Sequence, residues 1–184
     1  MPRAGTDPAR IVVFGNSGSG KSTWAIAQSA LLGCAHLDLD TVAWEPALSP
    51  PTRRSLQESQ SRIDTFVSAN EQWVIEGCYA DLLTHAARSA TEVIFLNPGV
   101  DICIANARQR PWEPHKYSSP AAQERNLEML LEWIRQYEVR TDEFSLLAHR
   151  ELFSRFAGAK HEFRSNARDG RSESLPETGG VESA

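Results

Sequence analysis

Residues 15–22 read GNSGSGKS, and they decide the fold because they satisfy the pattern G-x-x-x-x-G-K-[ST]. An apolar run, IVVF at residues 11–14, precedes the stretch, and a helix-compatible run follows it. Glycines let backbone N–H groups turn inward around a phosphate, and the N-terminus of the following helix adds partial positive charge. The stretch therefore predicts a binding site for the phosphates of a nucleoside triphosphate. The alternative is a glycine-rich turn that binds nothing.

Within this phosphate loop, Lys21 supplies a mobile cation for the β and γ oxygens, and Ser22 supplies a hydroxyl for Mg²⁺. We therefore expect ATP and Mg²⁺ as cofactors. The residues predicted to bind them are Gly15, Asn16, Ser17, Gly18, Ser19, Gly20, Lys21, Ser22 and Thr23.

Short apolar runs alternate with helical patterns along the rest of the chain. The strand-like runs are ARIVVFGN, CAHLDLD, QWVIEGC, TEVIFLN and, more weakly, AKHEFRS. Near-continuous apolar strands separated by helices are typical of a parallel sheet covered on both faces. The sequence predicts an α/β fold, a three-layer P-loop NTPase fold with a mainly parallel sheet of about five strands.

Helical spacing of apolar residues predicts four main helices. They cover residues 22–32, residues 51–69 with Ser49 as the cap, and residues 120–140 with Ser119 as the cap; a fresh helix starts at Thr141. Leu56 is expected on the apolar side of the second.

Composition limits the function classes. The 184 residues favour one compact domain over residues 1–164, and the polar residues 165–184 are predicted to be a disordered tail. The net charge of −5 provides no global field for nucleic acid or anionic lipid, so neither is expected as a partner. No apolar run approaches the roughly 20 residues that span a bilayer, and the N-terminus lacks a signal-peptide segment, which predicts a cytoplasmic protein. The three cysteines show no zinc or redox spacing.

The phosphate loop alone does not select a reaction, because switches, motors and kinases share it. A GTP switch would carry DxxG and NKxD elements, and neither string occurs. A motor ATPase would carry an apolar run that ends in paired acids, and neither WVIEG nor HLDLD has that pattern.

Four blocks, in order, are GNSGSGKST, HLDLDTVAWEP, WVIEGCY and VIFLNPGVDICIANARQR. Together they resemble the bacterial P-loop kinases related to adenylate and shikimate kinases, especially the small adenylate-kinase-like and topology-modulation-like proteins. The resemblance spans about residues 11–164. It implies an ATP-dependent phosphotransferase that moves the γ-phosphoryl group to a small-molecule or nucleoside monophosphate acceptor.

The resemblance also implies site residues. HLDLD ends the second strand, where such kinases place an acid at the acceptor, so Asp38 and Asp40 are acceptor candidates, and Asp40 is also a catalytic one. Two acids at positions i and i+2 of a strand face the same way. Glu76, Gly77 and Tyr79 are expected to line the acceptor pocket, and Glu76 to hold a water bound to Mg²⁺. The alternative for the acids is a solvated strand end or a cap.

Arginines complete the implied site. Arg108 and Arg110 lie where these kinases carry a mobile lid, with His115 and Lys116 beyond, and they are expected to act in catalysis together with Lys21. Arg53 is expected to bind an anionic acceptor. The alternative for each arginine is an ordinary surface charge.

A second function stays open. The chain could be an ATP-binding regulatory module with weak ATPase activity and a protein partner. LPETGG, residues 175–180, matches a sortase sorting signal, but only VESA follows it, so chance or an engineered handle is favoured over surface display.

Overall fold

The computed structural model describes residues 8–45, 52–114 and 118–166. β1 (Arg10–Gly15) lies in the middle of a five-stranded sheet of order β2-β5-β1-β6-β7, in which every neighbouring pair is parallel. The other strands are β2 (Ala35–Asp38), β5 (Trp73–Gly77), β6 (Glu92–Leu96) and β7 (Ala159–Phe163). The predicted α/β fold and all five predicted strands are confirmed.

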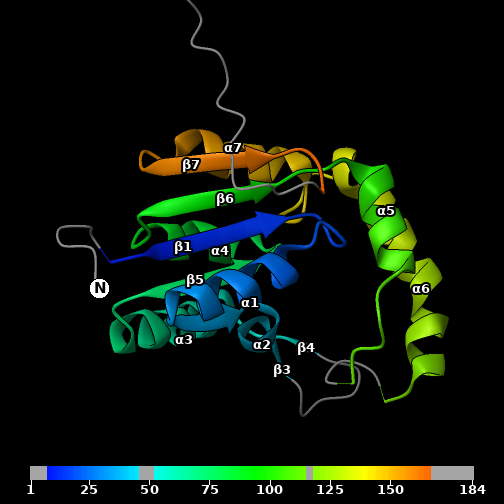
Figure 1. The fold of residues 1–184 in the computed structure, drawn as a ribbon, viewed down its shortest axis with the longest axis horizontal. Helices are drawn as coiled ribbons and strands as arrows, with labels where there is room; N and C mark the ends of the chain where they lie inside the picture. Colours follow the sequence, from blue (N-terminus) through cyan, green and yellow to red (C-terminus); the bar gives the residue numbers. More distant parts are fainter. Residues whose placement is uncertain (1–7, 46–51, 115–117, 167–184) are drawn as a thin grey trace, which may run out of the picture.

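Alternating side chains of β1 divide the core between the two faces of the sheet. Ile11 and Val13 pack on one face with Ala25 of α1 (Lys21–Leu32). Val12 and Phe14 pack on the other face, toward α4 (Ala80–Ala87) and α7 (Leu146–Arg155). Figure 1 shows α1 on one side of the sheet and α4 and α7 on the other. The molecule thus has three layers. Because all five strands are parallel, their carboxyl ends lie at one edge of the sheet.

The segment between β2 and β5 differs from the prediction. A short helix α2 (Asp40–Ala43) leads into a hairpin of β3 (Trp44–Glu45) and β4 (Thr52–Arg53), and α3 (Leu56–Ala69) begins only afterwards. Ser55, whose side chain accepts a hydrogen bond from the Glu58 N–H, is the cap. The expected start at residue 51 is therefore wrong, and Ser49 lies outside the described residues. Leu56, expected in the core, is exposed.

α5 (Val100–Arg108) and α6 (Pro120–Arg135) form a packed pair at the carboxyl edge of the sheet (Figure 1). Ser119 caps α6, as predicted, and a 3₁₀ turn η1 (Gln136–Glu138) follows that helix. The predicted helix start at Thr141 is wrong: α7 begins at Leu146 with Ser145 as its cap. The Asp142 carboxylate instead accepts the Phe144 N–H in a local turn.

His149 of α7 is fully buried beneath the carboxyl edge. Its Nε2 lies 3.0 Å from the carbonyl oxygen of Cys78, which can only accept, so Nε2 carries the proton. Its Nδ1, 2.7 Å from the Tyr137 hydroxyl, accepts the proton of that hydroxyl. Burial lowers the pKa of His149 to about 4. The imidazole is therefore a neutral link between the chain after β5 and the segment after α6.

We predict that His149 makes stability depend on pH. The unfolded chain has the higher histidine pKa, so it binds the proton first, and the stabilisation is complete above about pH 6.5 and lost as the pH falls toward 4. Between about pH 7.5 and about pH 5, urea unfolding should show the wild type losing about 2 kcal/mol more than a His149→Gln variant. Equal losses in the two proteins would contradict this assignment. Comparing the variant with the wild type removes the contributions of all other titrating groups.

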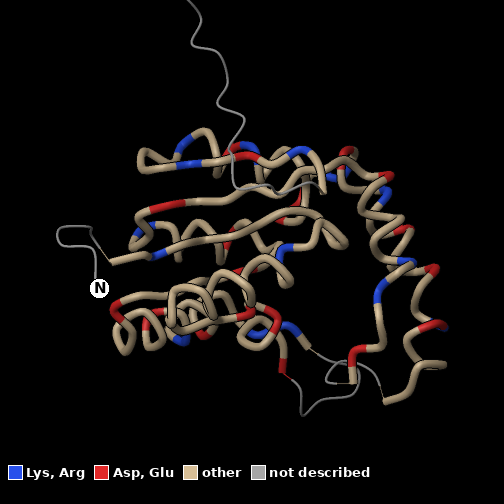
Figure 2. The backbone as a smooth tube through the Cα atoms, viewed as in Figure 1, with Lys and Arg blue, Asp and Glu red and all other residues tan. Residues whose placement is uncertain are grey.

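Charges are mixed along the described part of the chain. In Figure 2, Lys and Arg alternate with Asp and Glu around the molecule in this view. Within residues 8–45, 52–114 and 118–166, no helix combines the length and apolar character needed to cross a membrane.

Candidate functional site

The phosphate loop connects β1 to α1, and its glycines occupy positions that no other residue fits. Gly18 has φ +77° and Gly20 has φ +82°, both in the left-handed region. A Cβ on Gly15 would lie 2.2 Å from the carbonyl oxygen of Leu96, and a Cβ on Gly18 would lie 2.3 Å from that of Cys103. Gly20 precedes α1 and gives this helix no side-chain cap, so an anion at this N-terminus would meet backbone N–H groups.

Two asparagines join the loop to the α5 and α6 pair. The Asn16 side chain, buried, donates from Nδ2 to the Ile134 carbonyl at 3.1 Å. The Asn106 side chain donates from Nδ2 to the Gly18 carbonyl at 2.8 Å. Asn16, a predicted phosphate-binding residue, therefore uses one of the two N–H donors of its side-chain amide on α6.

Glu76 is the buried acid of the site. It is the penultimate residue of β5, beside Val13 of β1, and is only 1% exposed. Burial raises the pKa of Glu76, while the Lys21 charge and a hydrogen bond from Ser22 lower it. Among the described residues, its Oε1 has no hydrogen-bond partner. Lys21, Ser22 and Glu76, all predicted site residues, thus lie together.

His36 lies beside the same oxygen but does not neutralise it. Its Nε2 is 3.9 Å from Glu76 Oε1, too far for a hydrogen bond. Burial lowers the pKa of His36, so the ring is neutral near pH 7 and the contact is not an ion pair there. The Glu76 oxygen therefore remains available to a ligand.

Asp38 and Asp40 do not share a strand face. β2 ends at Asp38, and Asp40 is the first residue of α2, so the prediction from strand alternation is wrong. Asp38 Oδ1 accepts the Asp40 N–H at 2.9 Å, which folds the first acid over the start of α2. Gly77 makes this turn possible, because a Cβ there would lie 2.9 Å from Leu39. Both acids still lie close enough to Glu76 to raise its pKa.

Tyr79 orients Asp40. The buried Tyr79 hydroxyl donates to Asp40 Oδ1 at 2.6 Å and accepts the Trp44 Nε1–H at 2.6 Å. Burial and the Asp40 charge raise the pKa of Tyr79, so the hydroxyl keeps its proton and remains a donor. Trp44, which the sequence analysis did not assign to the site, thus fixes this pair. Nothing in its local sequence distinguishes it from a core aromatic residue.

Arg53 is engaged inside the protein. Its guanidinium pairs with Asp81 at 2.8 Å and with Glu143. It also lies over the rings of Tyr79, at 5.1 Å from the centroid, and Phe144, at 5.5 Å. The residue predicted to bind an anionic acceptor therefore lies beside Tyr79, but two carboxylates already balance its charge in this conformation.

Arg140 is a site candidate that sequence reasoning missed. Its guanidinium stacks on Trp133, 3.6 Å from the ring centroid, and also contacts the Phe144 ring. Nη2 pairs with Asp142 at 2.6 Å, while the buried Nε and Nη1 have no hydrogen-bond partner among the described residues. Buried donors without partners are rare. The Arg140 guanidinium therefore has donors for a further anion, next to the ring that also contacts Arg53 and Tyr79.

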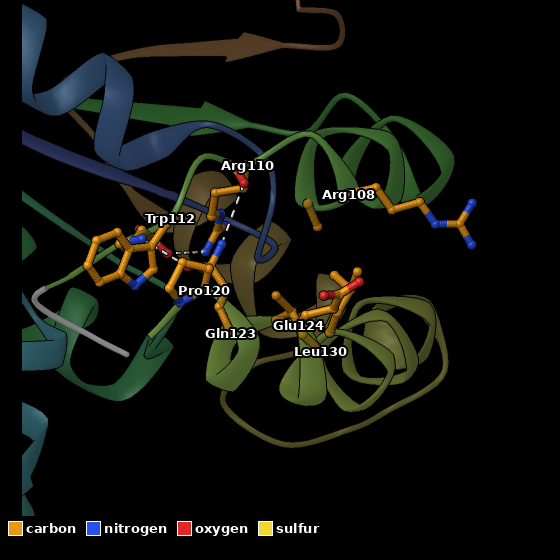
Figure 3. A pocket seen from close by; sticks show the side chains of 10 residues that line it. Arg108, Arg110, Trp112, Pro120, Gln123, Glu124 and Leu130 are labelled. Carbon is orange, nitrogen blue, oxygen red and sulfur yellow. Dashed lines mark hydrogen bonds and ion pairs between the residues drawn. The ribbon is translucent and has the colours of Figure 1, made fainter. Parts of the chain in front are cut away.

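The two predicted lid arginines point in different directions. A cavity of about 250 Å³ lies between the end of α5 and the start of α6 (Figure 3). Arg110 lies on its wall and pairs with Glu113 at 3.1 Å, beside Trp112. Arg108 ends α5 and also lines the cavity, but it is exposed and the end of its side chain extends away from the cavity in Figure 3. His115 and Lys116 lie outside the described residues.

A protein-family model described as an AAA domain matches residues 11–141. The chain belongs to the AAA domain family. The matched part of this AAA domain holds the phosphate loop, Asp38, Asp40, Glu76 and both lid arginines. No curated protein has a significant sequence match to the chain.

Solved structures similar to this AAA domain include three kinases. A gluconokinase from Sinorhizobium meliloti is 23% identical over 82% of this chain and 92% of its own, with a TM-score of 0.45. A sugar kinase from Janibacter sp. is 15% identical over 86% and 87%, with a TM-score of 0.46. A shikimate kinase from Acinetobacter baumannii, in complex with shikimate, is 16% identical over 79% and 91%, with a TM-score of 0.41. The family match covers most of residues 11–164, over which the sequence resembles P-loop kinases, and these structures say nothing about which acceptor the chain uses.

Proposed function

We propose that this AAA domain is an ATP-dependent phosphotransferase with a small anionic acceptor. The observation that carries the proposal is that the groups beside the phosphate loop and the groups around Tyr79 meet at Asp40. Lys21 and Ser22 of the phosphate loop lie beside Glu76, and Asp40 lies close enough to raise the pKa of Glu76. The Tyr79 hydroxyl binds Asp40, and the Tyr79 ring packs on Phe144, against which Arg140 also lies. This continuity supports a donor site that adjoins an acceptor site.

The residues present fit Mg·ATP. The close approach of Gly15 and Gly18 to neighbouring backbone leaves room only for a glycine cradle, as a phosphate site requires. The free oxygen of Glu76 next to the Ser22 hydroxyl suits a magnesium ion that keeps some of its waters. When bound, Mg²⁺ supplies charge neutralisation at the phosphate oxygens. Ser22 and Glu76 would hold it.

In the proposed reaction, the loop N–H groups and Lys21 hold the ATP phosphates. Asp40 accepts the proton of the acceptor hydroxyl as that oxygen forms its bond to the γ-phosphorus. The bond between the γ-phosphorus and the bridging oxygen breaks, ADP leaves with the electron pair, and Asp40 releases its proton to solvent. Tyr79 holds the Asp40 carboxylate in place throughout. Positioning and charge provide most of the rate enhancement, because this chemistry needs no covalent enzyme intermediate.

The test is ADP release from Mg·ATP with a panel of nucleoside monophosphates, shikimate, gluconate and a fractionated metabolite extract. One acceptor should stimulate turnover and leave the reaction as a phosphorylated product. If ATP binds and hydrolyses slowly whatever is added, the regulatory module with a protein partner becomes the better account, and the kinase proposal is wrong.

Arg140 gives a prediction about the acceptor. Arg140→Lys keeps the positive charge but removes the planar fork that stacks on Trp133 and offers two donors to one anion. Steady-state kinetics should show the KM for the acceptor rising about tenfold or more, with the Kd for Mg·ATP unchanged. Arg135→Lys, at an exposed arginine that pairs with Glu132, is the matched control. An unchanged acceptor KM in Arg140→Lys would remove Arg140 from the acceptor site.

A further inference from the structure

Hydrogen bonds join the phosphate loop to the α5 and α6 pair, and each partner donates one of them. Asn106 of α5 donates to the Gly18 carbonyl at 2.8 Å, and Asn16 of the loop donates to the Ile134 carbonyl of α6 at 3.1 Å. Cys103 lies three residues before Asn106, on the same side of α5, and its carbonyl occupies the space that a Gly18 Cβ would need. One face of α5 therefore packs directly on the middle of the loop.

The Asn106 amide is itself fixed. Its Nδ2 also lies 3.0 Å from Asn166 Oδ1, and Asn166 Nδ2 donates back to Asn106 Oδ1 at 2.9 Å. This pair and the Gly18 carbonyl together set which way the Asn106 amide faces. A flip of Asn106 alone would place like atoms against Asn166, and a joint flip of both amides would turn Asn106 Oδ1 toward the Gly18 oxygen, acceptor against acceptor. The donor that reaches Gly18 is therefore oriented before any ligand binds.

The direction of the Gly18 carbonyl matters for anion binding. A carbonyl oxygen carries partial negative charge, so a carbonyl that turned into the loop would repel a phosphate and displace an N–H group that binds it. We propose that Asn106 is a positioning residue: its amide holds the Gly18 carbonyl outward and so keeps the loop in its phosphate-binding shape. This inference rests on the proposed binding of a nucleotide at the loop.

The experiment measures binding to the full chain by calorimetry, with Mg·ADP and magnesium pyrophosphate as probes. Asn106→Leu keeps the size of the side chain and removes the donor, and both dissociation constants should rise about five- to tenfold, by the same factor. Asn166→Ala leaves the donor but frees its orientation, and should weaken both probes by about two- to threefold. The control is Asn126→Leu, at an α6 amide that donates to the Ala122 carbonyl of its own helix, and its constants should equal those of the wild type.

The outcomes separate this inference from the proposed function. Asn106→Leu with wild-type constants for both probes would overturn the inference, even if urea unfolding showed a loss of stability, because the role would then be structural only. Weaker binding of Mg·ADP with unchanged binding of magnesium pyrophosphate would also overturn it, since the substitution would then affect contacts with the nucleoside and not with the phosphates. If both probes weaken as expected but no acceptor is ever phosphorylated, the inference stands and the kinase proposal fails. If the wild type binds neither probe, both are wrong.

Discussion

Lys21→Met should lower acceptor-dependent phosphoryl transfer by about 10²- to 10³-fold, because it removes the cation that would neutralise the negative charge developing on the phosphate oxygens during transfer. A second effect acts in the same direction. The Lys21 charge is the largest influence that lowers the pKa of Glu76, and without it burial would favour the protonated acid. A single substitution at the start of α1 would thus weaken two charges of the site.

The measurement is kcat/KM for the acceptor, together with the Kd for Mg·ATP and urea unfolding. Methionine is a good helix former, so α1 should remain intact and the free energy of unfolding should change little. Lys160→Met is the matched control, since Lys160 lies on β7 and donates to carbonyls at the end of α7. Transfer within about threefold of the wild type in Lys21→Met would rule out a role for this cation in the reaction.

Asp40→Asn should lower kcat by about 10²- to 10⁴-fold while leaving the Kd for Mg·ATP unchanged, because the amide cannot accept the acceptor proton. The variant is conservative in shape, and its side-chain oxygen can still accept the Tyr79 hydroxyl. A loss confined to kcat would therefore come from the chemistry and not from misplacement of Tyr79 or Trp44.

Two comparisons make the Asp40 result specific. Asp64→Asn removes an exposed carboxylate of α3 that binds His85 of α4, and it should leave kcat unchanged. Asp38→Asn should have the smaller effect, since Asp38 Oδ1 already binds the Asp40 N–H. If Asp38→Asn lowered kcat more than Asp40→Asn, the two acids would have to exchange their assigned roles.

The strands and the phosphate loop could be predicted from the sequence because their signals are local. Apolar runs mark the five strands, and the loop glycines, together with Lys21 and Ser22, form a pattern whose spacing fixes the turn into α1. Glu76 was also predictable, since it directly follows an apolar run. For such residues, position along one element determines position in the site.

The remaining residues depend on packing between distant segments, which short patterns do not encode. Arg140 becomes a candidate only because Trp133 and Phe144 pack against it and two of its nitrogens have no hydrogen-bond partner in the described part of the chain. Arg53 was predicted to bind an anionic acceptor, and only the fold reveals that Asp81 and Glu143 pair with it. Asp40 was placed on the wrong element, because one buried residue, Leu39, turns the chain out of β2 and into α2.

The central position of β1 has a consequence for how the chain is made. The phosphate loop leaves the ribosome before the segments that shape it, because the atoms in contact with it come from Leu96, Cys103, Asn106 and Ile134. Contacts between residues so far apart in the sequence form late, because long loops must close first. A nascent chain that ends before α6 would carry the complete nucleotide motif without the Ile134 carbonyl that binds Asn16. We therefore expect a bound nucleotide to stabilise the nearly complete domain more than early folding states.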